Sequence, residues 1–242
     1  MTWLNPQDND DSALQRAMSS VASAVADPSR LSMLCALMDG RAWTATELSM
    51  VAEIAPSTAS GHLTRLLNDG LVLCLSQGRH RYYRLAGQEI ASLVENLMGV
   101  AMQPRLSPRT RPPVHLRYAR TCYDHLAGEL AVGIYAFMLN HSWISEEGDA
   151  LTSRGREQFL RLGIHPDTSS RRKACCPCLD WSERRFHLAG AAGAALLRLF
   201  IDKGWLQNTA GYRHLMVTTS GRTAFKRLFA IDPPTPGAEP RR

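Results

Sequence analysis

The sequence predicts a mainly α-helical protein with small β-wings, in which an N-terminal domain precedes a C-terminal helical domain built from an internal repeat. Within residues 12–102, short amphipathic helical patterns are separated by proline and glycine, and a strand–turn–strand pattern follows them. Residues 103–116 are rich in proline and arginine, which is typical of a linker. Residues 117–232 contain two similar segments, which indicates two structural units packed together.

Composition places the chain among ordinary globular proteins. Of its 242 residues, 45% are hydrophobic and 21% are charged. No run of about 18 consecutive apolar residues indicates a membrane span, and the N-terminal segment lacks the pattern of a secretory signal. We therefore expect a cytoplasmic protein without membrane association, whose six cysteines are reduced and not joined in disulfides.

The charge distribution does not by itself predict a nucleic-acid partner. The net charge is +6, but residues 1–103 carry seven arginines against ten acidic residues. Binding to DNA phosphates therefore requires a local basic patch, because the bulk charge of this domain has the wrong sign.

The N-terminal domain is expected to contain five helices and one hairpin. Residues 1–11 are polar and acidic, and we expect them to be disordered. Asp27 and Pro28 mark a helix start, because aspartate is a good N-cap and proline fits the first helical position. The expected helices cover residues 12–26, 30–38, 46–53, 56–68 and 88–102, and the hairpin pairs residues 71–76 with 81–85.

The helix over residues 56–68 presents two different faces. Apolar residues recur on one face at helical spacing and should pack inward; they are Ala59, Leu63, Leu66 and Leu67. The opposite face carries small hydroxyl side chains, which suit a helix that enters the major groove of DNA, and the hairpin tip is basic. The candidate DNA-contacting residues are Ser57, Thr58, Ser60, Gly61, His62, Thr64 and Arg65 on the helix, with Arg79, His80 and Arg81 at the hairpin tip.

Several spaced motifs together resemble the ArsR family of dimeric repressors. They are Ala26-Asp27-Pro28-Ser29-Arg30-Leu31, Thr46-Glu47-Leu48, the segment from Pro56 to Leu63, Gly70-Leu71-Val72 and the segment from Gly78 to Leu85. The resemblance implies a winged helix-turn-helix that regulates transcription and binds double-stranded operator DNA as a homodimer. The first and last helices of this domain would form the dimer interface. The residues after this domain would then form an extended C-terminal effector domain.

The chain also departs from the family pattern. Ala55 stands where a capping serine or aspartate is common, which weakens the helix start by about 1 kcal/mol. Gly61 replaces a longer polar side chain, so the family's base specificity does not transfer. The family's usual metal sites are missing, because residues 47–52 lack paired cysteines and residues 88–102 lack histidine. The alternative interpretation of the hydroxyl face is an ordinary solvent-facing helix.

The C-terminal repeat is visible as short matching motifs. His125-Leu126-Ala127-Gly128 recurs 62 positions later as His187-Leu188-Ala189-Gly190, and Trp143 recurs as Trp205 at the same offset. Each copy predicts a long apolar helix, a turn containing tryptophan, a short extended segment and an amphipathic helix. Neither apolar face could be buried alone, so the two copies should pack as one domain.

Cysteine and histidine residues occur close together at the start of each of the two copies. The candidate effector or metal residues are Cys122, His125, Cys175, Cys176, Cys178 and His187. Three thiols within four residues favour a thiophilic metal or metalloid as cofactor. Basic neighbours should lower the thiol pKa values and favour redox sensing; these are Arg171, Arg172 and Lys173. Alternatively the cluster is structural, or a small organic or anionic effector binds among Trp181, Glu183, Arg184 and Arg185.

Two other functional classes stay open at this stage. Cys175 and Cys178 form a Cys-x-x-Cys pair like that of a thiol oxidoreductase. That motif normally follows a strand and opens a helix, and no such pattern precedes Cys175, so we expect a regulator and not an enzyme. The other class is a metal-binding interaction module with a degenerate winged helix. The sequence also leaves open which effector acts and whether it releases or promotes DNA binding.

Overall fold

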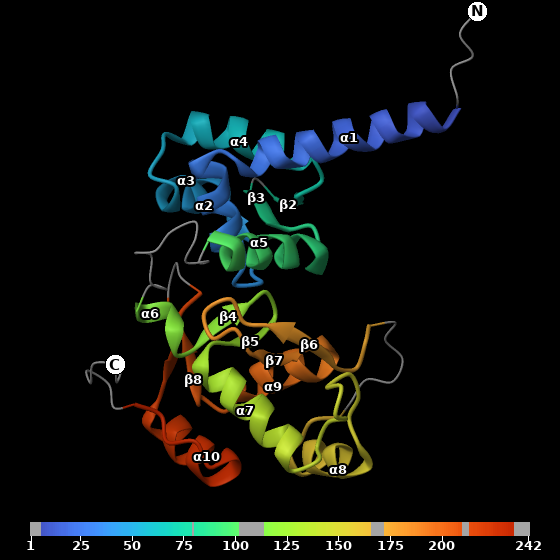
Figure 1. The fold of residues 1–242 in the computed structure, drawn as a ribbon. Helices are drawn as coiled ribbons and strands as arrows, with labels where there is room; N and C mark the ends of the chain where they lie inside the picture. The colour runs from blue at the N-terminus through green and yellow to red at the C-terminus, as the bar shows by residue number, and fades with distance from the viewer. Residues whose placement is uncertain (1–5, 79, 102–113, 166–171, 210–212, 235–242) are drawn as a thin grey trace, which may run out of the picture. The chain divides into compact units, whose positions relative to one another are not determined.

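The computed structural model describes residues 6–78, 80–101, 114–165, 172–209 and 213–234 (Figure 1). The chain divides into two compact units, Met1–Ala91 and Ser92–Arg242. The division falls inside a helix, whereas the sequence placed the linker at residues 103–116, most of which lie outside the described residues.

The first unit has the element order of a winged helix-turn-helix, as the sequence predicts. Its three strands form one antiparallel sheet in the order β1-β3-β2, in which β2 and β3 make the wing. The elements are α1 (Pro6–Val25), α2 (Pro28–Leu37), β1 (Trp43–Thr44), α3 (Ala45–Val51), α4 (Pro56–Asn68), β2 (Val72–Gln77), β3 (His80–Leu85) and α5 (Gln88–Ala101), which continues into the second unit.

Local sequence signals explain the helix starts. Asp27 caps α2 by accepting a 2.9 Å hydrogen bond from a backbone N–H of the first turn. Thr44 and Glu47 form a reciprocal capping box at the start of α3. Helix α1 already begins at Pro6, so the expectation of disorder is wrong for residues 6–11; the fixed φ of proline suits a first helical position.

Helix α4 covers the predicted residues and packs its apolar side into the core of the first unit. As the sequence indicates, Ala55 gives the start of α4 no side-chain hydrogen bond. The core lies between α2, α3 and α4, and its completely buried side chains include Met33, Leu34, Leu37, Leu48, Leu63 and Leu66.

The second unit combines helices with three two-stranded antiparallel sheets. The helices confirm the predicted helical character, but the hairpins β4–β5 and β6–β7 had not been expected. Among the described residues, every helix is too short or too polar to cross a membrane. The elements are α6 (Val114–Arg117), β4 (Arg120–Cys122), β5 (His125–Ala127), α7 (Glu129–Asn140), α8 (Ser153–Leu162), β6 (Cys176–Leu179), β7 (Phe186–Ala189), α9 (Gly190–Asp202), β8 (Leu206–Asn208), β9 (Leu215–Val217) and α10 (Thr219–Phe229).

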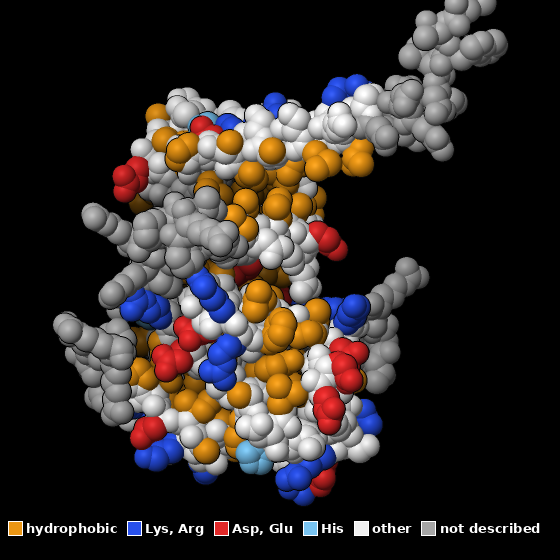
Figure 2. Space-filling model, in the orientation of Figure 1, with side chains coloured by type: hydrophobic (Ala, Val, Ile, Leu, Met, Phe, Trp, Pro, Cys, Tyr) orange, Lys and Arg blue, Asp and Glu red, His pale blue; other side chains and the backbone are white. Residues whose placement is uncertain are grey.

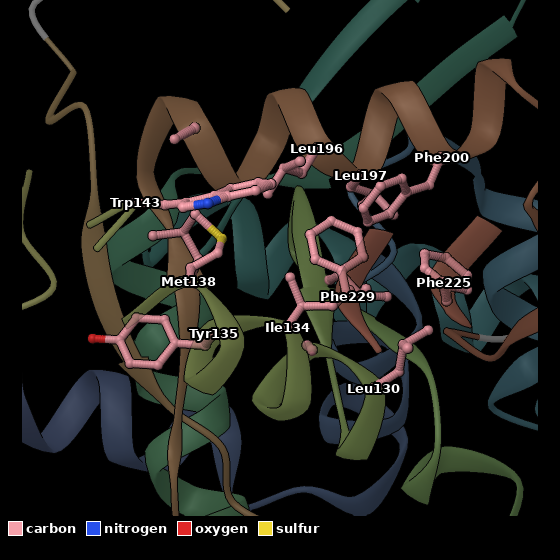
Figure 3. Close-up of a cluster of buried hydrophobic side chains, with 14 of the residues drawn as sticks. Leu130, Ile134, Tyr135, Met138, Trp143, Leu196, Leu197, Phe200, Phe225 and Phe229 are labelled. Carbon is pink, nitrogen blue, oxygen red and sulfur yellow. The ribbon is translucent and has the colours of Figure 1, made fainter. Parts of the chain in front are cut away.

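The core of the second unit is formed mainly by α7, α9 and α10 (Figure 3). Aromatic rings meet edge to face in it, with the Phe200 and Phe225 centroids 5.0 Å apart. Figure 3 labels Leu130, Ile134, Tyr135 and Met138 of α7, Trp143 of the following turn, Leu196, Leu197 and Phe200 of α9, and Phe225 and Phe229 of α10.

Helices α8 and α10 begin in the same way. Thr152 and Thr218 cap them by accepting hydrogen bonds from the backbone N–H groups of Gly155 and Gly221. Each glycine lies against the carbonyl of the tryptophan in the preceding turn, where a Cβ would collide. These matching helix starts agree with the proposed internal repeat, which itself stays a prediction.

Candidate functional site

The outward face of α4 is made of small and hydroxyl residues. Ala59, Leu63 and Leu66 point into the core, which leaves the other side of the helix to solvent. The exposed residues on α4 include Ser57, Thr58, Ser60, Gly61, Thr64 and Arg65, all of them sequence-predicted candidates. An added Cβ at Gly61 would meet no atom within 4 Å, so the helix surface is open at this point.

Two of the candidates on α4 also make contacts inside the unit. His62 is only 18% exposed, and its Nδ1 accepts a 3.0 Å hydrogen bond from Arg30 of α2. Arg65 donates to Asp69 at 2.7 Å and to the hydroxyl of Ser20 on α1 at 3.0 Å. His62 therefore fixes α4 against α2, and Arg65 must give up an ion pair before it can reach a phosphate.

The wing carries a basic, solvent-facing edge. His80 and Arg81 are exposed on β3, while Arg79 lies outside the described residues. The Arg81 side chain is anchored, because its Nε donates to Sγ of Cys74 at 3.4 Å and its guanidinium lies 5.6 Å from the ring centroid of Tyr83.

A second constellation lies in the other unit, where two hairpins bring four predicted residues together. Cys122 stands directly opposite His125 across β4–β5, and Cys178 stands directly opposite His187 across β6–β7. The ligand atoms of these four residues all lie within 4.8 Å of one another, and three of the residues are buried while Cys178 is half-buried. We call this group the Cys2His2 cluster; it does not include Cys175 or Cys176.

The two imidazoles of the cluster face each other through Nε2 and face carboxylates through Nδ1. Their Nε2 atoms are 3.2 Å apart. Nδ1 of His125 lies 3.3 Å from Oδ1 of Asp124, and Nδ1 of His187 lies 3.5 Å from Oδ2 of Asp180. Burial and the neighbouring His125 lower the pKa of His187, which keeps that ring neutral.

Each of these carboxylates is held by an arginine. Arg172 donates to both oxygens of Asp124, with a distance of 2.9 Å to Oδ1. Burial opposes the charge of Asp124, but hydrogen bonds from His125 and Arg172 outweigh it and lower its pKa to about 2.

Asp180 is more deeply buried than Asp124. Arg120 and Asp180 are completely buried and 2.8 Å apart, and the Gly128 backbone N–H donates to the other Asp180 oxygen at 2.7 Å. The Arg120 guanidinium also lies 4.6 Å from the ring centroid of Trp181. Burial opposes ionisation of Asp180, but Arg120 outweighs it and lowers its pKa.

The thiols do not share one environment. A hydrogen bond with Cys178 and burial raise the pKa of Cys122 well above its usual value. Cys175 is completely buried in the hydrophobic core, and this burial, with Asp149 and Cys176 nearby, raises its pKa to about 12. The expectation that basic neighbours lower the thiol pKa is therefore wrong for Cys175, because desolvation dominates. Of those neighbours, Arg171 lies outside the described residues.

The strand that carries Cys122 is also tied to helix α5. The backbone N–H of Thr121 donates to the carbonyl of Arg213 at 2.8 Å, and Nε of Arg213 donates to the carbonyl of Thr121 at 3.0 Å. The Arg213 guanidinium makes a 2.6 Å ion pair with Glu95 of α5, and both side chains are about 95% buried. This contact links β4 to the part of α5 that lies in the second unit.

A cavity of about 270 Å³ lies beside α9 in the same unit. Its wall is mostly apolar, with basic side chains from Arg172, Arg198 and His165. The cavity has room for a small organic molecule, and its basic lining favours an anionic one.

Several of these residues could not be identified from the sequence as part of a site. Asp124 and Asp180 precede or follow a cluster residue closely, and that adjacency is a usable signal for carboxylates that orient histidines. Nothing in the sequence pairs Arg120 with Asp180 or Arg213 with Glu95, because each pair is far apart along the chain.

A family model and the curated relatives agree on the class of the first unit. Residues 27–73 match the family described as "Bacterial regulatory protein, arsR family". The transcriptional activator HlyU of Vibrio cholerae is 35% identical over 74 residues, which cover 31% of this chain and 68% of HlyU. A solved homodimeric winged helix-turn-helix DNA-binding domain, Mb0332 of Mycobacterium bovis, is 26% identical with a TM-score of 0.38 and covers 47% of this chain and 100% of that chain.

One relative extends over both units. The HTH-type transcriptional regulator YdfF of Bacillus subtilis is 38% identical over 213 residues, which cover 86% of this chain and 94% of YdfF. The match is longer than either unit, so YdfF shares residues with the second unit as well as with the first.

Proposed function

We propose that this chain acts as a homodimeric repressor controlled by an effector. The premise is that the chain belongs to the ArsR family of bacterial regulatory proteins and is a DNA-binding transcriptional regulator. In this proposal α4 enters the major groove, the β2–β3 wing holds the adjacent backbone, and the second unit binds the effector. The effector acts because it binds the DNA-competent and the DNA-incompetent dimer with different affinities.

The open hydroxyl face of α4 is the observation that carries the proposal. Its short side chains allow the helix backbone to approach base edges, and hydroxyl groups both donate and accept hydrogen bonds there. The N-terminus of α4 receives no side-chain cap from Ala55, which leaves backbone N–H groups and the positive end of the helix dipole for a phosphate.

Exposed apolar residues on the flanking helices support a dimer. Leu14 and Met18 of α1 are 61% and 63% exposed, and apolar side chains gather along this helix in Figure 2. Leu97 and Val100 of α5 are also exposed. A second copy would remove these residues from water, and a twofold dimer presents two α4 helices to a palindromic site.

The test of DNA binding uses the full-length protein and a labelled duplex from the region upstream of its own gene. We expect a Kd on the order of 10⁻⁸ M that weakens steeply with salt, against a scrambled duplex that binds far less tightly. The variant Ser60→Glu places a negative charge on the exposed face of α4. Its matched control, Thr223→Glu, places the same charge on an exposed position of α10.

The two variants distinguish a specific role of the α4 face in DNA binding from a general effect of added negative charge. We expect Ser60→Glu to bind about 10- to 100-fold more weakly, and Thr223→Glu to bind like the wild type. Equal affinity of Ser60→Glu and the wild type, or equal binding of both duplexes by the wild type, would contradict the proposal.

Repression is tested in cells with a reporter behind the same upstream region. Deletion of the gene should raise reporter expression, and a fall in expression would show an activator instead. The completely buried Cys175 disfavours the oxidoreductase alternative, since a Cys-x-x-Cys enzyme needs an accessible thiolate. The cavity beside α9 is the alternative effector site for a small organic anion.

A further inference from the structure

Four side chains from two hairpins meet at one point of the second unit. Cys122 and His125 come from β4–β5, and Cys178 and His187 come from β6–β7. We propose that this Cys2His2 cluster binds one zinc-class divalent ion in a closed tetrahedral site, and that this ion is the regulator's effector. The metal site stands on the geometry alone, whereas its role as effector rests on the proposed function.

The spacing of the ligand atoms fits a tetrahedral ion. Zinc bonds of about 2.0–2.1 Å to nitrogen and about 2.3 Å to sulfur place the two nitrogens of a tetrahedron about 3.3 Å apart and the two sulfurs about 3.8 Å apart. The Nε2 atoms of His125 and His187 are 3.2 Å apart, and no pair of ligand atoms in the cluster exceeds 4.8 Å. Small side-chain movements therefore bring all four atoms within bonding distance of one ion.

A carboxylate lies beside Nδ1 of each histidine, and it makes a hydrogen bond with the ring at His125. Asp124 and Asp180 lie on the Nδ1 side of His125 and His187, and a carboxylate favours the tautomer that carries its proton on Nδ1. At the 3.2 Å between the two Nε2 atoms, either one ring donates a proton to the other or both lone pairs bind one shared cation. With two sulfur atoms at the same point, four donors converge there, and a metal ion satisfies all four while a proton satisfies two.

The surroundings of the cluster balance the charge of such an ion. Arg172 compensates Asp124, and Arg120 compensates Asp180, so the two carboxylates add no net charge. Two thiolates from Cys122 and Cys178 compensate a divalent cation. The complete centre is neutral, which is the condition under which burial of a charged group is tolerated.

The donor set indicates the class of metal and excludes a catalytic role for it. Two thiolates with two imidazoles select zinc and similar soft or borderline ions over magnesium or calcium, which prefer oxygen. All four positions of a tetrahedron are taken by protein atoms, whereas a catalytic zinc keeps one position open for water or substrate. The site is therefore suited to hold the fold in one arrangement.

The contacts of β4 connect the Cys2His2 cluster with the part of helix α5 that lies in the second unit. Cys122 follows Thr121, whose backbone exchanges hydrogen bonds with Arg213, and Arg213 forms the buried ion pair with Glu95 of α5. An ion that fixes Cys122 also fixes strand β4, to which Arg213 is hydrogen-bonded. Helix α5 runs from Gln88 to Ala101, and its first residues belong to the first unit.

The first experiment measures metal binding by the full-length protein. Reduced, metal-free protein is titrated anaerobically with Co²⁺, which reports tetrahedral thiolate coordination through its visible and charge-transfer absorption bands, and zinc content is measured after dialysis. We expect saturation at one ion per chain, displacement of Co²⁺ by Zn²⁺, and an increase in melting temperature. Absence of tetrahedral Co²⁺ bands, or failure to retain zinc, overturns the metal site.

Variants identify the ligands. Cys178→Ser should abolish the tetrahedral spectrum, whereas the control Cys176→Ser, on the same strand but outside the cluster, should keep it. Asp124→Asn should weaken metal affinity about 10- to 100-fold, because it loosens the orientation of His125. Equal loss in both cysteine variants overturns the assigned ligand set. A Cys122–Cys178 disulfide that forms reversibly in a protein unable to take up metal assigns the cluster to redox sensing and overturns the proposal.

The DNA arm separates the metal site from the proposed function. Metal-free and zinc-loaded protein are compared on the upstream duplex, and we expect their affinities to differ by about tenfold or more, with no difference for Cys178→Ser. Equal affinity of the two forms overturns the effector role and leaves DNA binding intact. Tight Co²⁺ binding without any affinity for the duplex would instead overturn the proposed function and leave the metal site standing.

Discussion

Gly61 provides a test in which stability and DNA affinity should change in opposite directions. It occupies an interior position of α4, where glycine is less favourable than alanine by about 1 kcal/mol because its backbone loses more freedom on folding. An added Cβ would meet no atom within 4 Å, and the residue is exposed. Gly61→Ala should therefore raise the free energy of unfolding of the first unit by about 1 kcal/mol, or its melting temperature by about 4–8 °C.

The same methyl group should weaken DNA binding. It projects from the face of α4 that we propose lies against base edges, so it holds the helix away from the groove at its most open point. Loss of a single good base contact is worth about 1–3 kcal/mol, which predicts a Kd about 5- to 150-fold higher for Gly61→Ala on the upstream duplex.

Urea denaturation and fluorescence anisotropy of the same preparations measure both effects. Thr223→Ala is the control, because it replaces an exposed helical residue of α10 by a better helix former and touches no proposed DNA contact. A stabilised Gly61→Ala variant that binds DNA within about twofold of the wild type would refute the close approach of α4. A Gly61→Ala variant that is not stabilised would refute the conclusion that Gly61 destabilises α4 at a position with room for a Cβ.

Four further predictions follow from the described contacts. Arg81→Ala should weaken binding about equally for all duplexes. It should also reduce the slope of log K against log salt by about one, the value expected for one lost phosphate contact, which anisotropy at several salt concentrations measures. The double variant Leu14→Gln/Met18→Gln should shift the dimer toward monomer in analytical ultracentrifugation, because it removes exposed apolar contact surface from α1. Asp27→Ala should lower stability by about 1 kcal/mol at neutral pH, whereas Asp27→Asn retains the cap. A backbone hydrogen bond lowers the Asp27 pKa in the folded state, so its contribution is complete above about pH 4 and disappears as the pH falls through the folded-state value, which denaturation at several pH values measures. Glu95→Ala should destabilise the second unit by about 3–5 kcal/mol, because it leaves a buried arginine unpaired, and calorimetry would contradict this if the transition did not move.

The winged helix-turn-helix was predictable because its signals are local. Proline at the start of α4, the stop signal after Asn68 and the apolar spacing of Ala59, Leu63 and Leu66 all act within one helix. The Thr44–Glu47 capping box at the start of α3 is a signal of the same kind. The full extent of α1 is not predicted, because a polar, acidic composition is typical of disorder and is also acceptable in an exposed helix.

The hairpins of the second unit were not predictable in this way. Strands β4 and β5 have three residues each, too few for an alternating pattern to stand out. The turn between them contains Tyr123 with a φ of 60°, a conformation that asparagine or glycine usually signals and tyrosine does not. His125 lies on β5, at a position where the sequence pattern does not predict a strand.

The two Cys–His pairs do not align in a sequence comparison, because the turns of their hairpins differ in length. His125 lies three residues after Cys122, whereas His187 lies nine residues after Cys178, because the second hairpin has a longer loop. Aligning the copies at an offset of 62 therefore matches the histidines and places Arg184 against Cys122. Both pairs become equivalent only in the folded state, where each cysteine faces its histidine across a two-stranded sheet.

The buried ion pair of Arg120 and Asp180 is better explained by the Cys2His2 cluster than by stability. Removing both charges from water carries a penalty that their attraction barely offsets, and well-packed apolar residues of similar size are commonly as stable or more so. What an apolar pair cannot do is present a carboxylate to Nδ1 of His187 and accept the Gly128 N–H at the same time. The pair places a carboxylate 3.5 Å from Nδ1 of His187, as Arg172 and Asp124 place one 3.3 Å from Nδ1 of His125, and a carboxylate on that side favours the tautomer whose Nε2 can bind a metal ion.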